Sequence, residues 1–244
     1  MGRFSIRFIS RFMVMLNVVC VNWGLKFKPK YVQVLYNMVQ RHLTITHKFI
    51  LFTDRIKFHK EMEIGNNYEV RKLPFENYTG YWHKLSLFSP EANLNGPNLY
   101  FDLDVVIKDN IDCFAEYGED DSFCVIRDFG QPQQWYNSSI LKFNNTNATS
   151  FIWDKFLENK QKDLALQGDQ NVITNYINQK PGVKKLKVFP DIWTQSYKWL
   201  DRSQTRFHKT AFTFEESPKA KVAVFHGNPK PHESDQEWVK NHWK

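Results

Sequence analysis

The chain has 244 residues and, with 33 Lys and Arg against 26 Asp and Glu, a formal net charge of +7 at pH 7. A hydrophobic content of 42% can bury a large core, which excludes a generally disordered chain. The 10 Gly and 10 Pro exclude collagen-like and low-complexity sequences. We expect one domain over 1–244, because large α/β enzymes often reach this length as one unit.

The first twelve residues, 1–12, carry three arginines among Phe and Ile. We expect a basic lead-in to the first strand, and a membrane-surface segment is the alternative, so peripheral membrane association stays open. The apolar run Met13–Val21 contains an Asn and is shorter than the roughly 20 residues of a membrane-spanning helix. We therefore expect a soluble protein without a transmembrane segment.

The three cysteines form an odd set without a CxxC metal pattern. Cys20, Cys113 and Cys124 are widely separated and show no disulfide framework. Such usage is typical of a reducing compartment, and we expect a cytoplasmic protein.

A strand, a helix and a second strand are predicted at the start of the chain. Val14–Val21 is almost continuously apolar, which is typical of a strand buried on both faces. From Pro29 onward, apolar residues recur at helical spacing, and Lys48–Phe52 returns to a strand pattern. Such a unit builds a parallel sheet whose ligand lies at the carboxyl ends of the strands, so we expect loop 22–28 to face a ligand.

Strands and helices continue to alternate toward the C-terminus. Further strands are predicted at Glu69–Leu73, Asn98–Leu103, Phe123–Ile126, Ser139–Phe143 and Val222–Phe225. Helices are predicted at Tyr81–Phe88, Ser150–Asn159 and Gly168–Asn178. The pattern predicts an α/β fold with a mixed, mainly parallel central sheet flanked by helices, followed by a polar surface tail over 232–244.

Two acids lie in the most informative stretch of the sequence, which is otherwise largely apolar. Asp102 and Asp104 belong to the stretch Leu99–Ile107, where an unpaired buried carboxylate would cost several kcal/mol. In an extended chain both side chains point to one face, opposite Leu103. Mg²⁺ or Mn²⁺ would suit such a pair, because these ions take oxygen ligands and leave positions for phosphate oxygens. The alternative is a strand-end pair neutralised by Lys or Arg.

The Asp-x-Asp motif at a strand end resembles that of glycosyltransferases with the GT-A fold. The sequence is most similar to glycosyltransferase family 8 and its bacterial and phage relatives, over about three quarters of the chain. The resemblance implies a single GT-A-like, Rossmann-like domain and a nucleoside-diphosphate sugar as donor. It also implies that Asp102 and Asp104 hold the Mn²⁺ or Mg²⁺ that binds the diphosphate.

Three further segments match the family in the expected order. They are Tyr81–Leu85, Asn137–Leu141 and Gly168–Asn171. The resemblance implies that Lys84 in the first points at the donor and that Asn137 in the second contacts the donor sugar. In the third, Asp169 and Gln170 are expected near the reacting carbon. Outside the motif, Asn137 would be an ordinary strand-start amide and Asp169 an ordinary helix cap.

The segment Phe225–Pro231 resembles the family's C-terminal His, Gly, Lys-Pro motif. Aligned on Gly227 and Lys230, the metal-binding His of the family falls on Val224, two residues before His226. Positions i and i+2 of a strand share a face, so we expect His226 to reach the same cation. His232 is the other candidate, and a loop histidine bound to the backbone is the alternative role of His226.

Lys230 is expected to hold the diphosphate, because a point cation beside a Gly and Pro turn can approach an anion closely. A solvated surface lysine is the alternative. At the end of the first strand, Asn22 and Trp23 occupy the region where the family contacts the nucleoside, without the family's usual acid. The sequence therefore does not predict which base the donor nucleotide carries.

An aromatic group is a candidate platform for the acceptor sugar, with core packing as the alternative. Its members are Trp135, Tyr136, Trp193, Tyr197 and Trp199. Taken together, these features predict a metal-dependent glycosyltransferase that moves a sugar from a nucleoside-diphosphate donor to a hydroxyl of a saccharide or glycoconjugate. Retention at the anomeric carbon is favoured only by the resemblance.

Two alternative functions share some of these features. A nucleotidyl- or phosphotransferase also uses paired carboxylates, but no GxxxxGK[ST] phosphate loop is present. A non-catalytic polysaccharide or nucleic-acid binding module would not need acids in an apolar strand, and Lys and Arg are spread along the chain. We expect no nucleic-acid partner.

Overall fold

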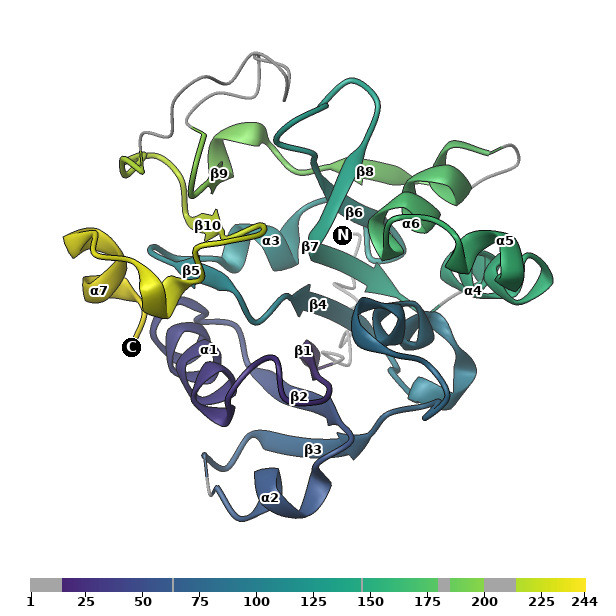
Figure 1. Ribbon diagram of the computed structural model, residues 1–244, viewed down its shortest axis with the longest axis horizontal. Helices are drawn as coiled ribbons and strands as arrows, with labels where there is room; N and C mark the ends of the chain where they lie inside the picture. The colour runs from purple at the N-terminus through teal and green to yellow at the C-terminus, as the bar shows by residue number, and fades with distance from the viewer. Residues whose placement is uncertain (1–14, 63, 146, 180–184, 200–213) are drawn as a thin grey trace, which may run out of the picture.

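The computed structural model describes residues 15–62, 64–145, 147–179, 185–199 and 214–244 (Figure 1). The predicted lead-in 1–12 lies outside the described residues. Among the helices in these ranges, none has the length and apolar character needed to cross a membrane.

A seven-stranded sheet forms the centre of the molecule, in the order β3-β2-β1-β4-β7-β6-β8. Its strands are β1 (Leu16–Asn22), β2 (His47–Thr53), β3 (Tyr68–Lys72), β4 (Pro97–Phe101), β6 (Phe123–Arg127), β7 (Tyr136–Asn144) and β8 (Leu186–Val188). β7 runs antiparallel to β4 and β6, and the other neighbouring pairs are parallel. The predicted mixed, mainly parallel sheet is confirmed.

A second sheet of three short strands has the order β5-β10-β9. Its strands are β5 (Val105–Ile107), β9 (Thr194–Ser196) and β10 (Val222–Val224). β5 pairs antiparallel with β10, and the Phe225 amide donates to the Asp104 carbonyl at 3.1 Å. This pairing brings the C-terminal segment beside the two acids.

Helices cover both faces of the central sheet, because strand side chains alternate between two cores. Val18 belongs to one core and Val19 to the other. The first core also holds residues of α1 (Pro29–His42), and the second holds residues of α4 (Asn147–Glu158) and α6 (Asp169–Asn178). In Figure 1, α1 and the pair α4 and α6 lie on opposite sides of the sheet.

The long elements follow the sequence pattern closely. α1 starts with Pro29 at its first turn, ends with Arg41 and His42 in its last, and buries its apolar stripe. The predicted helix at Tyr81–Phe88 is a 3₁₀ helix, η1 (Gly80–Phe88). The shorter helical elements are α2 (Ile56–Lys60), η2 (Pro90–Ala92), α3 (Asp112–Glu116), α5 (Lys160–Leu164), η3 (Asp191–Trp193), η5 (Pro231–Glu233) and α7 (Glu237–His242).

Two expectations differ from the structure. β4 ends at Phe101, so Asp102 and Asp104 lie in the turn before β5 and not on one extended strand. The segment 232–244 is not simply a polar surface tail, because Val239 of α7 is fully buried in the first core. Apolar residues at helical spacing anchor this short helix despite its polar composition.

Candidate functional site

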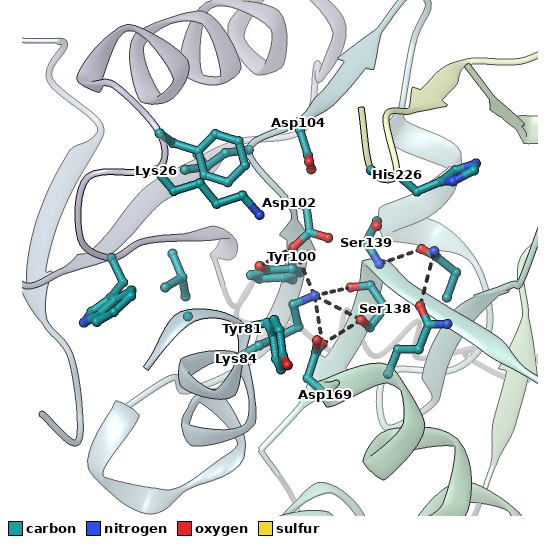
Figure 2. Close-up of a pocket in the computed structure, with 18 of the residues that line it drawn as sticks. Lys26, Tyr81, Lys84, Tyr100, Asp102, Asp104, Ser138, Ser139, Asp169 and His226 are labelled. Carbon is teal, nitrogen blue, oxygen red and sulfur yellow. Dashed lines mark hydrogen bonds and ion pairs between the residues drawn. The ribbon is translucent and has the colours of Figure 1, made fainter. Parts of the chain in front are cut away.

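A pocket of about 500 Å³ opens at the carboxyl ends of β1 and β4 (Figure 2). Because β7 runs antiparallel to β4, its first residues lie at the same edge of the sheet. The residues predicted for catalysis, donor binding and the metal line this pocket, except Asn22 and the second histidine candidate, His232. The fold therefore gathers segments that are far apart in the sequence, as expected for the edge where parallel strands end.

Lys84 of η1 lies at the centre of a buried polar network. Its Nζ is 3.0 Å from Asp102 Oδ1 and 3.0 Å from Asp169 Oδ2, and it donates to the Ser138 hydroxyl at 3.0 Å. Burial favours the neutral amine, but the two carboxylates outweigh it and raise the pKa of Lys84 above its ordinary value. The side chain is a buried cation that links two of the predicted site acids.

Asp102 has a second donor that the sequence reasoning missed. The Tyr100 hydroxyl donates to Asp102 Oδ1 at 2.7 Å. Burial opposes ionisation, yet Lys84 and Tyr100 together hold the pKa of Asp102 below its ordinary value. The sequence does contain a signal for this contact, because a Tyr two positions before an Asp at a strand end can reach the same edge of the sheet as the Asp.

Asp104 is paired with a different lysine. Lys230 Nζ lies 2.5 Å from Asp104 Oδ2 and donates to the Phe225 carbonyl at 3.3 Å. Burial and the neighbouring Asp102 carboxylate raise the pKa of Asp104 despite this pairing. Each aspartate thus contacts one lysine, which corresponds to the alternative in which Lys or Arg neutralises the acid pair.

His226 does not lie beside the acid pair. Its Nε2 is 2.6 Å from the Ser196 hydroxyl, and its ring stacks on Phe129 with centroids 5.6 Å apart. In Figure 2 the ring points away from Asp102 and Asp104. β10 ends at Val224, so His226 lies beyond the strand and the shared-face argument does not extend to it.

His232 also makes contacts elsewhere. Its Nδ1 lies 2.5 Å from the Tyr31 hydroxyl, and it is not among the pocket-lining residues. Within the described ranges, no group of three or more His, Cys, Asp and Glu side chains could hold a metal ion. Two carboxylates still fit Mg²⁺ or Mn²⁺, because such ions are often held by one or two carboxylates with water and substrate phosphates.

The opposite side of the pocket carries amide and carboxylate groups. Asn137 accepts a hydrogen bond from the Ser139 amide at 2.9 Å, and its Nδ2 is 3.5 Å from Gln170 Oε1. Gln170 donates to Asp128 Oδ2 at 3.3 Å, a partner that the sequence reasoning missed. These contacts fix the orientation of the two amides toward the pocket.

Asp169 is the first residue of α6, and Gly168 is the N-cap. Its carboxylate accepts from the Ser138 hydroxyl at 2.7 Å and contacts Lys84. The side chain therefore faces the pocket network and is not the helix cap. A carboxylate in the first turn is also favoured by the helix dipole.

At the end of β1, the two residues expected near the nucleoside lie on opposite sides of the chain. Asn22 is fully buried, and its Nδ2 lies 3.4 Å from His59 Nε2. Strand alternation places Val21 and Trp23 on the pocket side and Asn22 on the opposite side, which corrects the expectation for Asn22. Lys26 and Phe27 of the following loop also line the pocket.

The predicted acceptor platform is not part of this pocket. None of its five aromatic residues is among the lining residues. Tyr197 is buried and stacks on Phe225 with centroids 4.0 Å apart, and Trp193 packs against Phe114 at 5.2 Å. For these two, core packing is the observed role. The aromatic side chains Trp23, Phe27, Tyr81 and Tyr100 line the pocket instead, and Tyr81 is half exposed.

No protein-family model and no curated protein matches the sequence. Solved glycosyltransferase structures do match the fold. An active-site mutant of LgtC is 14% identical with a TM-score of 0.64, covering 92% of this chain and 93% of its own. Mouse xyloside xylosyltransferase 1 is 12% identical with a TM-score of 0.56, covering 87% of this chain and 98% of its own.

The glycosyltransferase GlyE of Streptococcus pneumoniae TIGR4, in its apo form, is 16% identical with a TM-score of 0.66 over 89% of this chain. The match spans 56% of the GlyE chain, so this protein corresponds to about half of that longer one. At these identities the similarity establishes the fold. The chain has the GT-A fold of these glycosyltransferases.

Proposed function

We propose that the protein is a metal-dependent glycosyltransferase that moves a sugar from a nucleoside-diphosphate donor to a hydroxyl of a saccharide or glycoconjugate. The observation that carries the proposal is one pocket with two kinds of group. Asp102, Asp104 and Lys230 line one part of it, and Asn137 and Gln170 line another. The first set suits a cation and a diphosphate, and the second suits sugar hydroxyls.

Asp102 and Asp104 would hold Mn²⁺ or Mg²⁺, which supplies positive charge against the charge that grows on the departing diphosphate. The Lys230 ammonium would contact the same diphosphate. Lys84 would act differently from the role that the resemblance implies. Its bonds to Asp102 and Asp169 favour a positioning role between the cation ligand and the sugar side.

Asn137, Asp169 and Gln170 would orient the donor sugar so that its anomeric carbon meets the incoming hydroxyl. Holding two reactants in a productive geometry lowers the entropic part of the barrier. The contacts among Asn137, Gln170 and Asp128 support this role, because a side chain held by its neighbours loses little freedom on binding.

A panel of nucleotide sugars with Mn²⁺ tests the function. Slow hydrolysis of one donor to sugar and nucleoside diphosphate is expected. Release of nucleoside monophosphate would instead indicate cleavage of the phosphoanhydride bond within the diphosphate, as in a nucleotidyltransferase. No turnover of any donor, with or without acceptor saccharides, would contradict the proposal and favour a binding module.

Replacing Lys230 with Ala should weaken nucleoside-diphosphate binding at saturating Mn²⁺ by about tenfold or more. The variant loses a charge-assisted hydrogen bond, which is typically worth about 1.5–3 kcal/mol. Titration calorimetry measures the affinity. Lys28→Ala, which removes an exposed charge outside the pocket lining, is the matched control and should change little. Equal affinity of Lys230→Ala and the wild type would remove Lys230 from the diphosphate site.

A further inference from the structure

Lys230 neutralises the very carboxylate that a divalent cation would need. Its Nζ is 2.5 Å from Asp104 Oδ2, and the two side chains are only 13% and 14% exposed. The Coulomb attraction within an ion pair so shielded from water is stronger than in a fully exposed pair. A cation arriving at Asp104 must therefore displace an ammonium group that is already bonded there.

The Lys230 backbone is fixed independently of its side chain. Its amide donates to Glu233 Oε2 at 2.7 Å, and its carbonyl accepts from the Glu233 amide at 2.9 Å. Lysine carries its charge on a flexible four-carbon stem with rotatable donors. The ammonium can therefore change acceptor by side-chain rotation while η5 stays in place.

The formal charges of the pocket also favour joint binding of a divalent cation and a diphosphate. Apart from His226, the lining residues carry three carboxylates and three ammonium groups, so −3 and +3 cancel. They are Asp102, Asp104, Asp169, Lys26, Lys84 and Lys230. A divalent cation alone, or a diphosphate alone, would leave a partly buried net charge of about two units, which is costly. The two together leave the pocket near neutrality.

We propose that Lys230 is an internal counterion that makes cation binding conditional on the diphosphate. It holds Asp104 when the donor is absent and passes to the diphosphate when the cation takes Asp104. This inference rests on the proposed function, because it takes Asp102 and Asp104 as the ligands of the cation. It assigns Lys230 a role in selecting the metal–diphosphate complex over the metal alone.

The test is the affinity for Mn²⁺ alone, without nucleotide, measured by titration calorimetry or by the electron paramagnetic resonance signal of free Mn²⁺. Lys230→Met should bind Mn²⁺ about tenfold more tightly than the wild type, because no ammonium competes at Asp104. Adding Asp104→Asn to Lys230→Met should abolish this gain. Lys230→Gln, which keeps a polar group without the charge, replaces Lys230→Met if circular dichroism shows that the latter is unfolded.

Lys26→Met is the matched control, because it removes the same charge from the same pocket lining. Its gain should stay below about threefold, since a charge farther from Asp104 has a weaker effect. A second readout is the effect of UDP, GDP or ADP, whichever the wild type binds, on Mn²⁺ affinity. This coupling should be about tenfold or more in the wild type and smaller in Lys230→Met.

Two results would overturn this inference and leave the proposed function standing. One is equal Mn²⁺ affinity of the wild type and Lys230→Met, with binding still dependent on Asp104. The other is an equal gain in Lys26→Met and Lys230→Met, which would reduce the effect to general pocket charge. If neither the wild type nor Lys230→Met binds Mn²⁺, with or without nucleotide, the inference fails together with the metal-dependent function.

Discussion

Asp104→Asn is expected to lower Mn²⁺-dependent donor turnover by at least about 100-fold while the protein stays folded. The amide has nearly the shape of the carboxylate, but it carries no charge for a cation. Asp102→Asn should have a comparable effect on turnover. The measurement is the initial rate of donor hydrolysis at increasing Mn²⁺, with circular dichroism to verify the fold.

Asp235→Asn is the control for this pair, because it removes a fully exposed carboxylate by the same change. It should retain the wild-type rate. Full activity of Asp102→Asn and Asp104→Asn, or equal wild-type activity in excess chelator, would contradict a metal held by these residues.

Lys84→Met should destabilise the protein by about 3–5 kcal/mol and remove activity. The change leaves the carboxylates of Asp102 and Asp169 without their shared cation inside the protein. Denaturant unfolding measures the loss of stability, as a lower midpoint at unchanged slope.

A double variant separates the ion-pair network from simple loss of packing. Adding Asp169→Asn to Lys84→Met removes one of the orphaned charges, so part of the lost stability should return. Asp169→Asn alone should instead destabilise the protein. Strictly additive losses would show that Lys84 and Asp169 do not interact energetically.

The stability contributed by this network depends on pH in a defined direction. The pKa of Lys84 is raised, so its contribution is complete below its ordinary value of 10.5 and is lost at higher pH. The pKa of Asp102 is lowered, so its contribution is complete above the ordinary value of 3.8 and is lost on acidification. Between these limits the wild type should be least sensitive to pH. Lys84→Met should lose less stability relative to the wild type near pH 4 than at pH 7.

The long elements were predictable because their residues repeat a simple pattern. The apolar runs of β1 and β2 and the helical stripe of α1 each reflect burial on a fixed face. The segments β5, β9 and α2 contain only three to five residues, which is too short for a periodic pattern to be distinguished from chance. Their positions depend on tertiary pairing, as when β5 meets β10 across more than a hundred residues.

Most of the predicted site residues do line the pocket, but the contacts among them were not predictable from the sequence. The motif order placed Lys84, Asp102 and Asp169 near one another, while the bonds that join them depend on side-chain positions set by packing. The stacking of His226 on Phe129 arises from segments far apart in the sequence. Asn22 was wrongly assigned because alternate residues of a strand face opposite sides, and the sequence does not show which side carries the pocket.

Crystals grown with Mn²⁺ and the donor's nucleoside diphosphate test the central claim most directly, through anomalous scattering at the manganese edge. A peak between the carboxylates of Asp102 and Asp104, with the Lys230 ammonium on the diphosphate, is the result we predict. Bound nucleotide with no anomalous peak, and with Lys230 still on Asp104, would contradict it.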